Sequence, residues 1–171
     1  MIETLTSTML NKLIISKAQE SDLMTILQLQ CLAYHCEAKR YNDFSTPPLR
    51  QTLTELIEEA SKSTILKATI DQKLVGSVRA TLEGDTCKIG RLIVDPKFHG
   101  QGIDTMLLER IEASFPKAWR FELFTGARSM RSLSLYRRRG YRECKRDLLT
   151  DHASVVFLEK LRITHPAKSS N

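Results

Sequence analysis

The first 61 residues contain one strand-like apolar run, followed by two segments with the pattern of helices and a polar stretch between them. Residues Leu13–Lys17 form a short, mostly apolar run that is typical of a strand. Residues 20–34 repeat apolar side chains every three or four positions, which predicts a helix. Residues 35–48 are polar and aromatic without a period and predict a loop. The two prolines at its end suit the start of a second helix over residues 49–61.

From residue 64 onward the pattern alternates between strand-like and helical segments. Turn residues at positions 71–73 and 84–85 separate the first three strands, and glycine or proline ends the later helices. The predicted elements are strands at Thr64–Ile70, 74–83 and Thr86–Val94, a helix at 105–115, a strand at 119–125, a helix at 129–139, and strands at 142–149 and Ala153–Leu161.

This order of elements predicts a mixed α/β fold with a central sheet. The 171 residues contain no internal repeat and no stretch with the composition of a linker. A chain of this length is expected to bury a full core without disulfides. We therefore predict one domain over residues 1–171, with its core at about 13–161 and tails at 1–12 and 162–171.

Composition and charge narrow the function. Hydrophobic residues make up 42% and charged residues 27%, as in ordinary globular proteins. The apolar runs are far shorter than the roughly 20 residues of a membrane span, and the N-terminus lacks the pattern of a signal peptide. Four scattered cysteines favour a reduced, cytoplasmic protein.

Much of the net charge of +6 is concentrated between residues 128 and 146. Such a basic cluster favours a polyanion, either a nucleic acid or a phosphorylated cofactor, although a solvated helix face would have the same composition. Aromatic residues are not interleaved with the basic ones as a nucleic-acid platform requires, so nucleic-acid binding ranks lowest.

Residues 89–108 carry the clearest chemical signal. An apolar strand runs into a short loop with Gly100 and Gly102, and a helix begins immediately. This arrangement presents unpaired backbone N–H groups and the positive end of a helix dipole to an anion, typically a phosphate. An ordinary turn between a strand and a helix would have the same appearance.

The surrounding residues resemble the GNAT family of N-acetyltransferases. Its first motif is a strand L-x-V followed by P-x-x-[QR]-x-x-G-x-[GA] and a leucine-rich helix, matched here from Leu92 to Leu108. Its second motif, L-Y-x-x-x-G-[FY], is matched by residues 133–141, with Tyr136 at the tyrosine position. The resemblance covers about residues 13–161. It implies the GNAT fold, a mixed and mostly antiparallel twisted sheet flanked by about four helices.

The resemblance implies an acetyl-CoA-dependent N-acetyltransferase without a metal, acting as a monomer or homodimer on an amine acceptor away from membranes. The strand backbone would pair with the pantetheine arm, the loop would hold the pyrophosphate, and residues near the second motif would meet the remaining phosphate charge. The implied cofactor-binding residues are Leu92, Ile93, Val94, His99, Gly100, Gln101, Gly102, Ile103, Asp104, Thr105, Ser132 and Arg139, with Arg131 also near.

The family mechanism is direct attack of a neutral amine on the thioester. Tyr136 would protonate the leaving thiolate, although it could equally be a packed tyrosine. Glu122 is the candidate general base, and a surface carboxylate near Arg120 is the alternative. Glu37, Asp43 or a chain of water molecules could serve instead.

The predicted loop at residues 35–48, with Tyr34, His35 and Tyr41 in or beside it, lies where family members shape the acceptor site, although these aromatic residues could equally be packed. Cys31 and Cys36 flank His35 but lack a second pair that would complete a metal site. The identity of the amine is not encoded in any motif.

Two positions depart from the family pattern. His99 replaces arginine or glutamine, and its imidazole can still donate a hydrogen bond to phosphate. Asp104 stands where the family has glycine or alanine. At 5 Å a carboxylate and a phosphate charge repel by about 3 kcal/mol at an effective dielectric constant of 20. That corresponds to about a hundredfold in affinity. The alternative function is therefore a GNAT-fold binding protein with weak or no catalysis.

Overall fold

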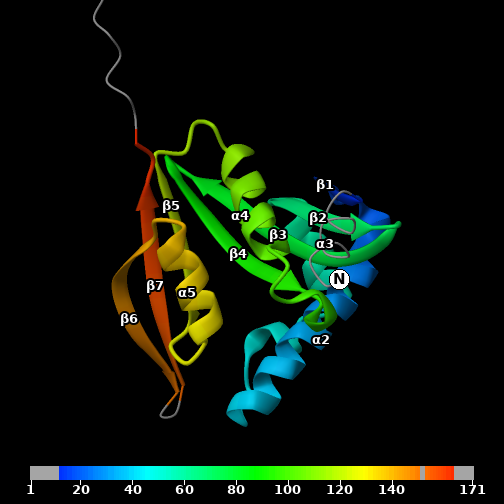
Figure 1. Cartoon of the computed structure of the whole chain (residues 1–171), viewed down its shortest axis with the longest axis horizontal. Coiled ribbons are helices and arrows are strands. Elements are labelled where there is room, and N and C mark those ends of the chain that lie inside the picture. Colours follow the sequence, from blue (N-terminus) through cyan, green and yellow to red (C-terminus); the bar gives the residue numbers. More distant parts are fainter. Residues whose placement is uncertain (1–11, 151–152, 164–171) are drawn as a thin grey trace, which may run out of the picture. The chain divides into compact units, whose positions relative to one another are not determined.

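The computed structural model describes residues 12–150 and 153–163 (Figure 1). Its elements follow the predicted order, with a seven-stranded sheet, α-helices and short 3₁₀ turns. The N-terminal and C-terminal tails of the prediction lie largely outside the described residues. The mixed α/β architecture predicted from the sequence is confirmed.

The first helical region differs from the prediction at both helices. After strand β1 (Leu13–Lys17) and turn η1 (Glu20–Asp22), helix α2 spans Leu23–Tyr41, so the first half of the predicted loop is helical. Good helix-forming residues occupy this extension, and Asn42 ends the helix in the left-handed conformation with its N–H bonded to the Ala38 carbonyl.

The second helix begins later than predicted. The two prolines form a separate turn, η2 (Pro47–Leu49), and helix α3 spans Leu53–Ala60. Thr52 caps this helix, because its hydroxyl accepts the Glu55 N–H while the Glu55 carboxylate accepts the Thr52 N–H.

Antiparallel pairing predominates in the sheet. The strands are β2 (Thr64–Ile70), β3 (Lys73–Glu83), β4 (Thr86–Val94), β5 (Arg120–Gly126), β6 (Arg142–Thr150) and β7 (Ala153–Leu161). Their order across the sheet is β1-β2-β3-β4-β5-β7-β6. Only β4 and β5 run parallel among the pairs with a described register, which agrees with the mostly antiparallel prediction.

The described chain groups into two compact units, each with part of β3 and β4. Within the described residues, the first holds 12–81 and 89–114, and the second holds 82–88, 115–150 and 153–163. A single domain over the whole chain remains a prediction.

Helix α4 (Ile103–Ala113) lies along the strands of the first unit (Figure 1). A Cβ atom added to Gly76 of β3 would lie 2.9 Å from Leu107 Cδ1 and 3.1 Å from the Ile93 carbonyl oxygen. Any larger residue at this position would require Leu107 or the neighbouring strand to shift. The packing fixes the start of α4 against the end of β4, where the predicted phosphate loop begins.

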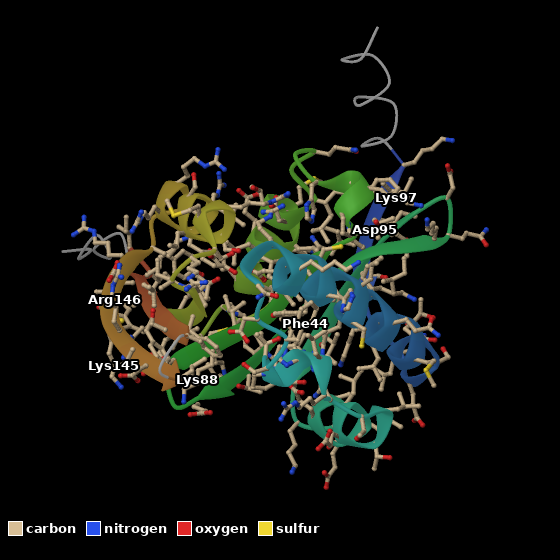
Figure 2. The ribbon with its side chains drawn as sticks, turned by 90° about the horizontal axis from the view of Figure 1, so that it is seen from below. Phe44, Lys88, Asp95, Lys97, Lys145 and Arg146 are labelled. Carbon is tan, nitrogen blue, oxygen red and sulfur yellow. The ribbon has the colours of Figure 1, made fainter. Side chains whose placement is uncertain are left out.

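Helix α5 (Met130–Arg138) belongs to the second unit, with β5, β6 and β7. Leu133 and Tyr136 of α5 are buried, as are Phe121 of β5 and Val156 of β7. Part of the basic cluster lies on β6, where Figure 2 shows Lys145 and Arg146. Lys145 pairs with Asp147 and Arg146 pairs with Glu143, so these two cations are neutralised locally.

Candidate functional site

Strand β4 ends in a turn that two hydrogen bonds of Asp95 hold in place. The Asp95 N–H donates to the Val75 carbonyl on β3 at 2.8 Å, and the Asp95 carboxylate accepts the Lys97 N–H at 3.0 Å (Figure 2). Turn η3 (Pro96–Phe98) follows. These bonds direct the chain away from the sheet and into the loop before α4.

Gly100 and Gly102 give this loop its shape. Their φ angles are 77° and 81°, a region that other residues rarely adopt. A Cβ atom added to either glycine would meet no atom within 4 Å, so the space beside the loop is open. Gly102 is the N-cap of α4, whose first N–H groups point toward this space as at any helix start. The loop therefore has the shape and the dipole of an anion site.

Gln101 carries an unsatisfied polar atom in the same loop. Its Oε1 is buried and has no hydrogen-bond partner among the described residues. Because the two ends of a glutamine amide can be exchanged, the side chain could present its NH₂ group at this point. A phosphate oxygen would then satisfy the donor. This observation supports the fit of the loop to a pyrophosphate.

The His99 side chain contacts the end of strand β4. Its Nε2 lies 3.1 Å from the Val94 carbonyl oxygen, which requires that Nε2 carry the proton. The Val94 carbonyl is one of the groups predicted to pair with pantetheine. A carbonyl oxygen has two lone pairs, so the His99 contact does not by itself exclude a second donor. The predicted bond from His99 to phosphate remains a prediction.

Asp104 lies in the first turn of α4, and its Oδ1 accepts the Thr105 N–H at 2.8 Å. The carboxylate therefore accepts a hydrogen bond from an N–H group that could otherwise donate to a bound pyrophosphate. Its negative charge also lies at the end of the helix where the dipole stabilises an anion. Asp104 thus stabilises the helix start, and it would compete with any anion that binds there.

The second unit positions the other predicted residues on α5 and just after it. Tyr136 is 7% exposed, and its ring centroid is 5.9 Å from that of Tyr141. The Ser129 hydroxyl donates to the Ser132 hydroxyl at 3.0 Å at the start of the helix. Arg139 ends the helix, where its N–H donates to the Leu135 and Tyr136 carbonyls. The catalytic role of Tyr136 remains a prediction.

Glu122 lies on β5 in an ion-pair network. Its Oε2 accepts from Arg120 Nη2 at 2.7 Å, and Arg120 Nε lies 2.8 Å from Glu159 Oε2. The pairing occupies one oxygen of the Glu122 carboxylate. The structure thus places Glu122 in the surroundings that the alternative reading described, and its role as base remains a prediction.

A buried polar cluster of the first unit was not identified from the sequence. Arg79 of β3 is 4% exposed, donates to Gln30 of α2, and pairs with Glu59 of α3. Arg91 of β4 lies over the ring of Tyr34 of α2, with Cζ 5.9 Å from the centroid. The sequence offered one indication of this cluster. Gln30 occupies an apolar position of its helix, and Arg79 and Arg91 each lie within a mostly apolar strand.

The residues that the structure describes contain no group of three or more His, Cys, Asp or Glu side chains that could hold a metal ion. Within the same ranges, no helix is long and apolar enough to cross a membrane.

Comparison with protein families gives one match. The family model described as "Acetyltransferase (GNAT) domain" matches residues 32–161, which include the loop, α4 and α5. No curated protein matches the sequence.

Solved structures with the same fold include several acetyltransferases. The PaiA N-acetyltransferase from Thermoplasma acidophilum in complex with coenzyme A is 16% identical with a TM-score of 0.70, over 88% of this chain and 99% of that one. The ribosomal-protein-S18-alanine N-acetyltransferase from Escherichia coli is 16% identical with a TM-score of 0.73, over 93% and 99%. An acetyltransferase from Streptococcus agalactiae 2603 is 20% identical with a TM-score of 0.71, over 88% and 99%. At these identities the likeness concerns the fold.

Proposed function

Because the chain belongs to the GNAT acetyltransferase family, whose members use acetyl-CoA, we propose that it transfers the acetyl group of acetyl-CoA to a primary amine. In this proposal the loop at residues 99–105 binds the pyrophosphate of acetyl-CoA. The observation that carries the proposal is the pair of glycines with positive φ that opens onto the start of α4. Open space beside both glycines and the unsatisfied Gln101 amide support it. A solved structure of the same fold in complex with coenzyme A supports the choice of cosubstrate.

Acetyl-CoA supplies an activated acetyl group as a thioester. The backbone of residues 92–94 orients the pantetheine arm, with the second lone pair of the Val94 carbonyl as one acceptor. Ile103 is buried and holds the start of α4 in place, while the N–H groups of the loop meet the phosphate charge. Such fixed donors bind an anion without reorganising.

On the second unit, Tyr136 donates a proton to the leaving thiolate, and Ser132 and Arg139 contribute to cosubstrate binding. Glu122 accepts the proton of the ammonium form of the acceptor, whose pKa near 10.4 keeps it protonated at neutral pH. Release of one Glu122 oxygen from Arg120 would precede that step. The monomeric or homodimeric state and the cytoplasmic location stay predictions.

Asp104 favours a second candidate function, a GNAT-fold protein that binds a partner and catalyses weakly. Its carboxylate occupies the Thr105 N–H and places a negative charge where phosphate would lie. The two candidates differ in one measurable property, the affinity for acetyl-CoA.

A panel of amines with acetyl-CoA, followed by the release of free thiol, tests the proposal. The panel contains amino acids, polyamines, aminoglycosides and peptides with free N-termini. We expect thiol release with at least one class, and a melting temperature that rises with acetyl-CoA. At 100 times the dissociation constant a ligand stabilises the fold by about 2.7 kcal/mol. Stabilisation by acetyl-CoA without thiol release would support the cosubstrate site but not acetyl transfer to these amines. The absence of both stabilisation and thiol release would refute the proposal and favour the second candidate.

A further inference from the structure

Arg91 occupies an unusual position in β4, directly before the strand segment at residues 92–94. Its φ angle is 50°, in the left-handed region that non-glycine residues rarely adopt within a strand. Such an irregularity redirects a side chain relative to the regular pleat, and strained residues cluster at functional sites. The guanidinium of Arg91 lies against the Tyr34 ring.

The donors of Arg91 are incompletely used. Its Nε is buried and has no hydrogen-bond partner among the described residues, and no carboxylate there forms an ion pair with it. The residue as a whole is half-buried, so part of it lies at the protein surface. An arginine without a carboxylate partner in a partly dry environment is electrostatically incomplete.

The neighbouring Arg79 shows what a complete partner set looks like in the same cluster. Its Nη1 pairs with Glu59 at 2.7 Å, and its Nη2 donates to Gln30 and, at 3.4 Å, to Gln51. Burial lowers the pKa of Arg79, Glu59 opposes this shift, and the charge of Arg91 adds to it. Arg79 and Arg91 thus repel each other, and only Arg79 has its own carboxylate.

Tyr34 cannot supply the missing negative charge. Burial raises the pKa of its hydroxyl, Arg91 opposes that rise, and Glu37 adds to it. Tyr34 therefore stays neutral at physiological pH. Glu37 is the remaining carboxylate near this group, and it forms no ion pair with Arg91. Glu59 and Glu37 balance the formal charges of Arg79 and Arg91, but neither carboxylate forms an ion pair with Arg91, so a bound carboxylate would be its first direct ionic partner among the described residues.

We propose that Arg91 binds a carboxylate of the acceptor, so that the amine acetylated by this protein is a small amino acid. The inference rests on the proposed function. In an α-amino acid the amine and the carboxylate share one carbon, so an anchored carboxylate holds the amine a few ångströms away. This distance between amine and carboxylate is similar to the rise of about 3.3 Å per residue along a strand. Arg91 would thereby place the amine beside residues 92–94.

Steady-state kinetics with matched acceptors tests the proposal. Each of the twenty proteinogenic L-amino acids is compared with its α-amide, which keeps the amine and removes the carboxylate. We expect the wild type to prefer the acids. Arg91→Gln should raise KM for the acid by about ten- to a hundredfold, with kcat and the KM for acetyl-CoA nearly unchanged. Arg91→Lys keeps the charge but lacks the planar guanidinium, so its KM for the acid should lie between those of the wild type and Arg91→Gln.

The matched control is Arg110→Gln, which removes an exposed arginine of α4 in the same unit. It should leave the preference for acids intact. Melting temperatures of all variants exclude unfolding as the cause. Wild-type activity on amides equal to that on acids, or equal KM values in wild type and Arg91→Gln, would overturn the carboxylate contact while the acetyltransferase proposal stands.

A readout without turnover separates the two proposals. The Nε–H signal of Arg91 in ¹⁵N spectra, assigned by its loss in Arg91→Gln, should shift when L-amino acids are added and stay in place with the corresponding amides. A shift without thiol release from any amine would support the carboxylate contact and refute acetyl transfer. No shift with any amino acid would overturn the carboxylate contact, whatever the activity.

Discussion

Replacing Asp104 with asparagine or glycine is expected to tighten the binding of acetyl-CoA. Asp104 Oδ1 lies 2.8 Å from the Thr105 nitrogen, within the turn whose N–H groups would receive the pyrophosphate. Asparagine keeps an oxygen that can accept the Thr105 N–H and removes only the charge. Glycine removes the charge and also frees the N–H group. The two variants therefore separate repulsion from competition.

The geometry sets the magnitude. A phosphate oxygen on a neighbouring N–H of the same turn would lie about 5 Å from the carboxylate, a separation that costs about 3 kcal/mol at an effective dielectric constant of 20. With a Debye length near 8 Å at physiological salt, screening reduces this to about half. The expected gain in affinity is therefore about ten- to a hundredfold, with the larger value at low salt.

Calorimetric titration with acetyl-CoA at two salt concentrations measures this effect for the wild type, Asp104→Asn and Asp104→Gly. The control is Glu109→Gln, the same loss of charge on an exposed residue of α4 more than one turn further along the helix. The free energy of unfolding should fall by about 0.3–1 kcal/mol in Asp104→Asn, because the carboxylate stabilises the helix dipole.

Equal affinity in all three forms at low salt would refute the reasoning, because the loop then carries no phosphate near Asp104. A gain in Asp104→Gly alone would show that competition for the N–H group outweighs the charge. A gain in both variants together with new turnover of amines would identify the natural chain as a disabled acetyltransferase.

Three further changes test other parts of the account. Tyr136→Phe should lower kcat by roughly a hundredfold and leave the affinity for acetyl-CoA unchanged, as stopped-assay kinetics and calorimetry can show. Gly76→Ala should destabilise the fold by about 1–3 kcal/mol in urea unfolding, because its Cβ would lie 2.9 Å from Leu107. Burial raises the pKa of Asp22, but the bonds from Lys67 outweigh it and lower the pKa below 3.8. The stabilisation is therefore present above that value and lost as the pH falls through the folded-state pKa, so Asp22→Asn should cost about 1 kcal/mol at pH 7 and much less at pH 3.

Each of these has a result that would contradict it. Unaltered turnover in Tyr136→Phe would remove the acid role of the hydroxyl. A Gly76→Ala protein as stable as the wild type would mean that β3 and α4 separate at little cost. A cost of Asp22→Asn that is the same at both pH values would mean that the pair with Lys67 contributes no pH-dependent stability.

Strand boundaries were predictable because each strand is a compact apolar run between turn residues. Strands Thr64–Ile70 and Thr86–Val94 match the prediction, since Asp71, Gln72 and Gly84 adopt positive φ at the intervening turns. The extension of α2 to Tyr41 was missed because its last residues are mostly polar and bury few side chains. An apolar period signals only those helices that bury a face.

The later start of α3 had a readable signal. Thr52 and Glu55 have the spacing of a capping box, which places the helix start after Thr52 rather than at the prolines. The prolines alone suggested an earlier start, because proline suits the first turn of a helix. In this chain they form their own turn.

The candidate site was predictable only where it is contiguous in sequence. The loop with Gly100 and Gly102 is one such segment, and its position before α4 follows from local pattern. The cluster around Arg79 and Arg91 joins α2, α3, β3 and β4, so its members become neighbours only through folding. Likewise the sequence identified Asp104, while the direction of its carboxylate toward Thr105 depends on a side-chain rotamer.

The most direct test of the central claim is a titration of the ¹⁵N-labelled protein with coenzyme A, followed by backbone amide chemical shifts. If the loop holds the pyrophosphate, the largest shifts should occur at residues 92–94 and 99–105, and inorganic pyrophosphate alone should move the second group. Shifts confined to other parts of the chain, with these amides unchanged at saturating coenzyme A, would contradict the account.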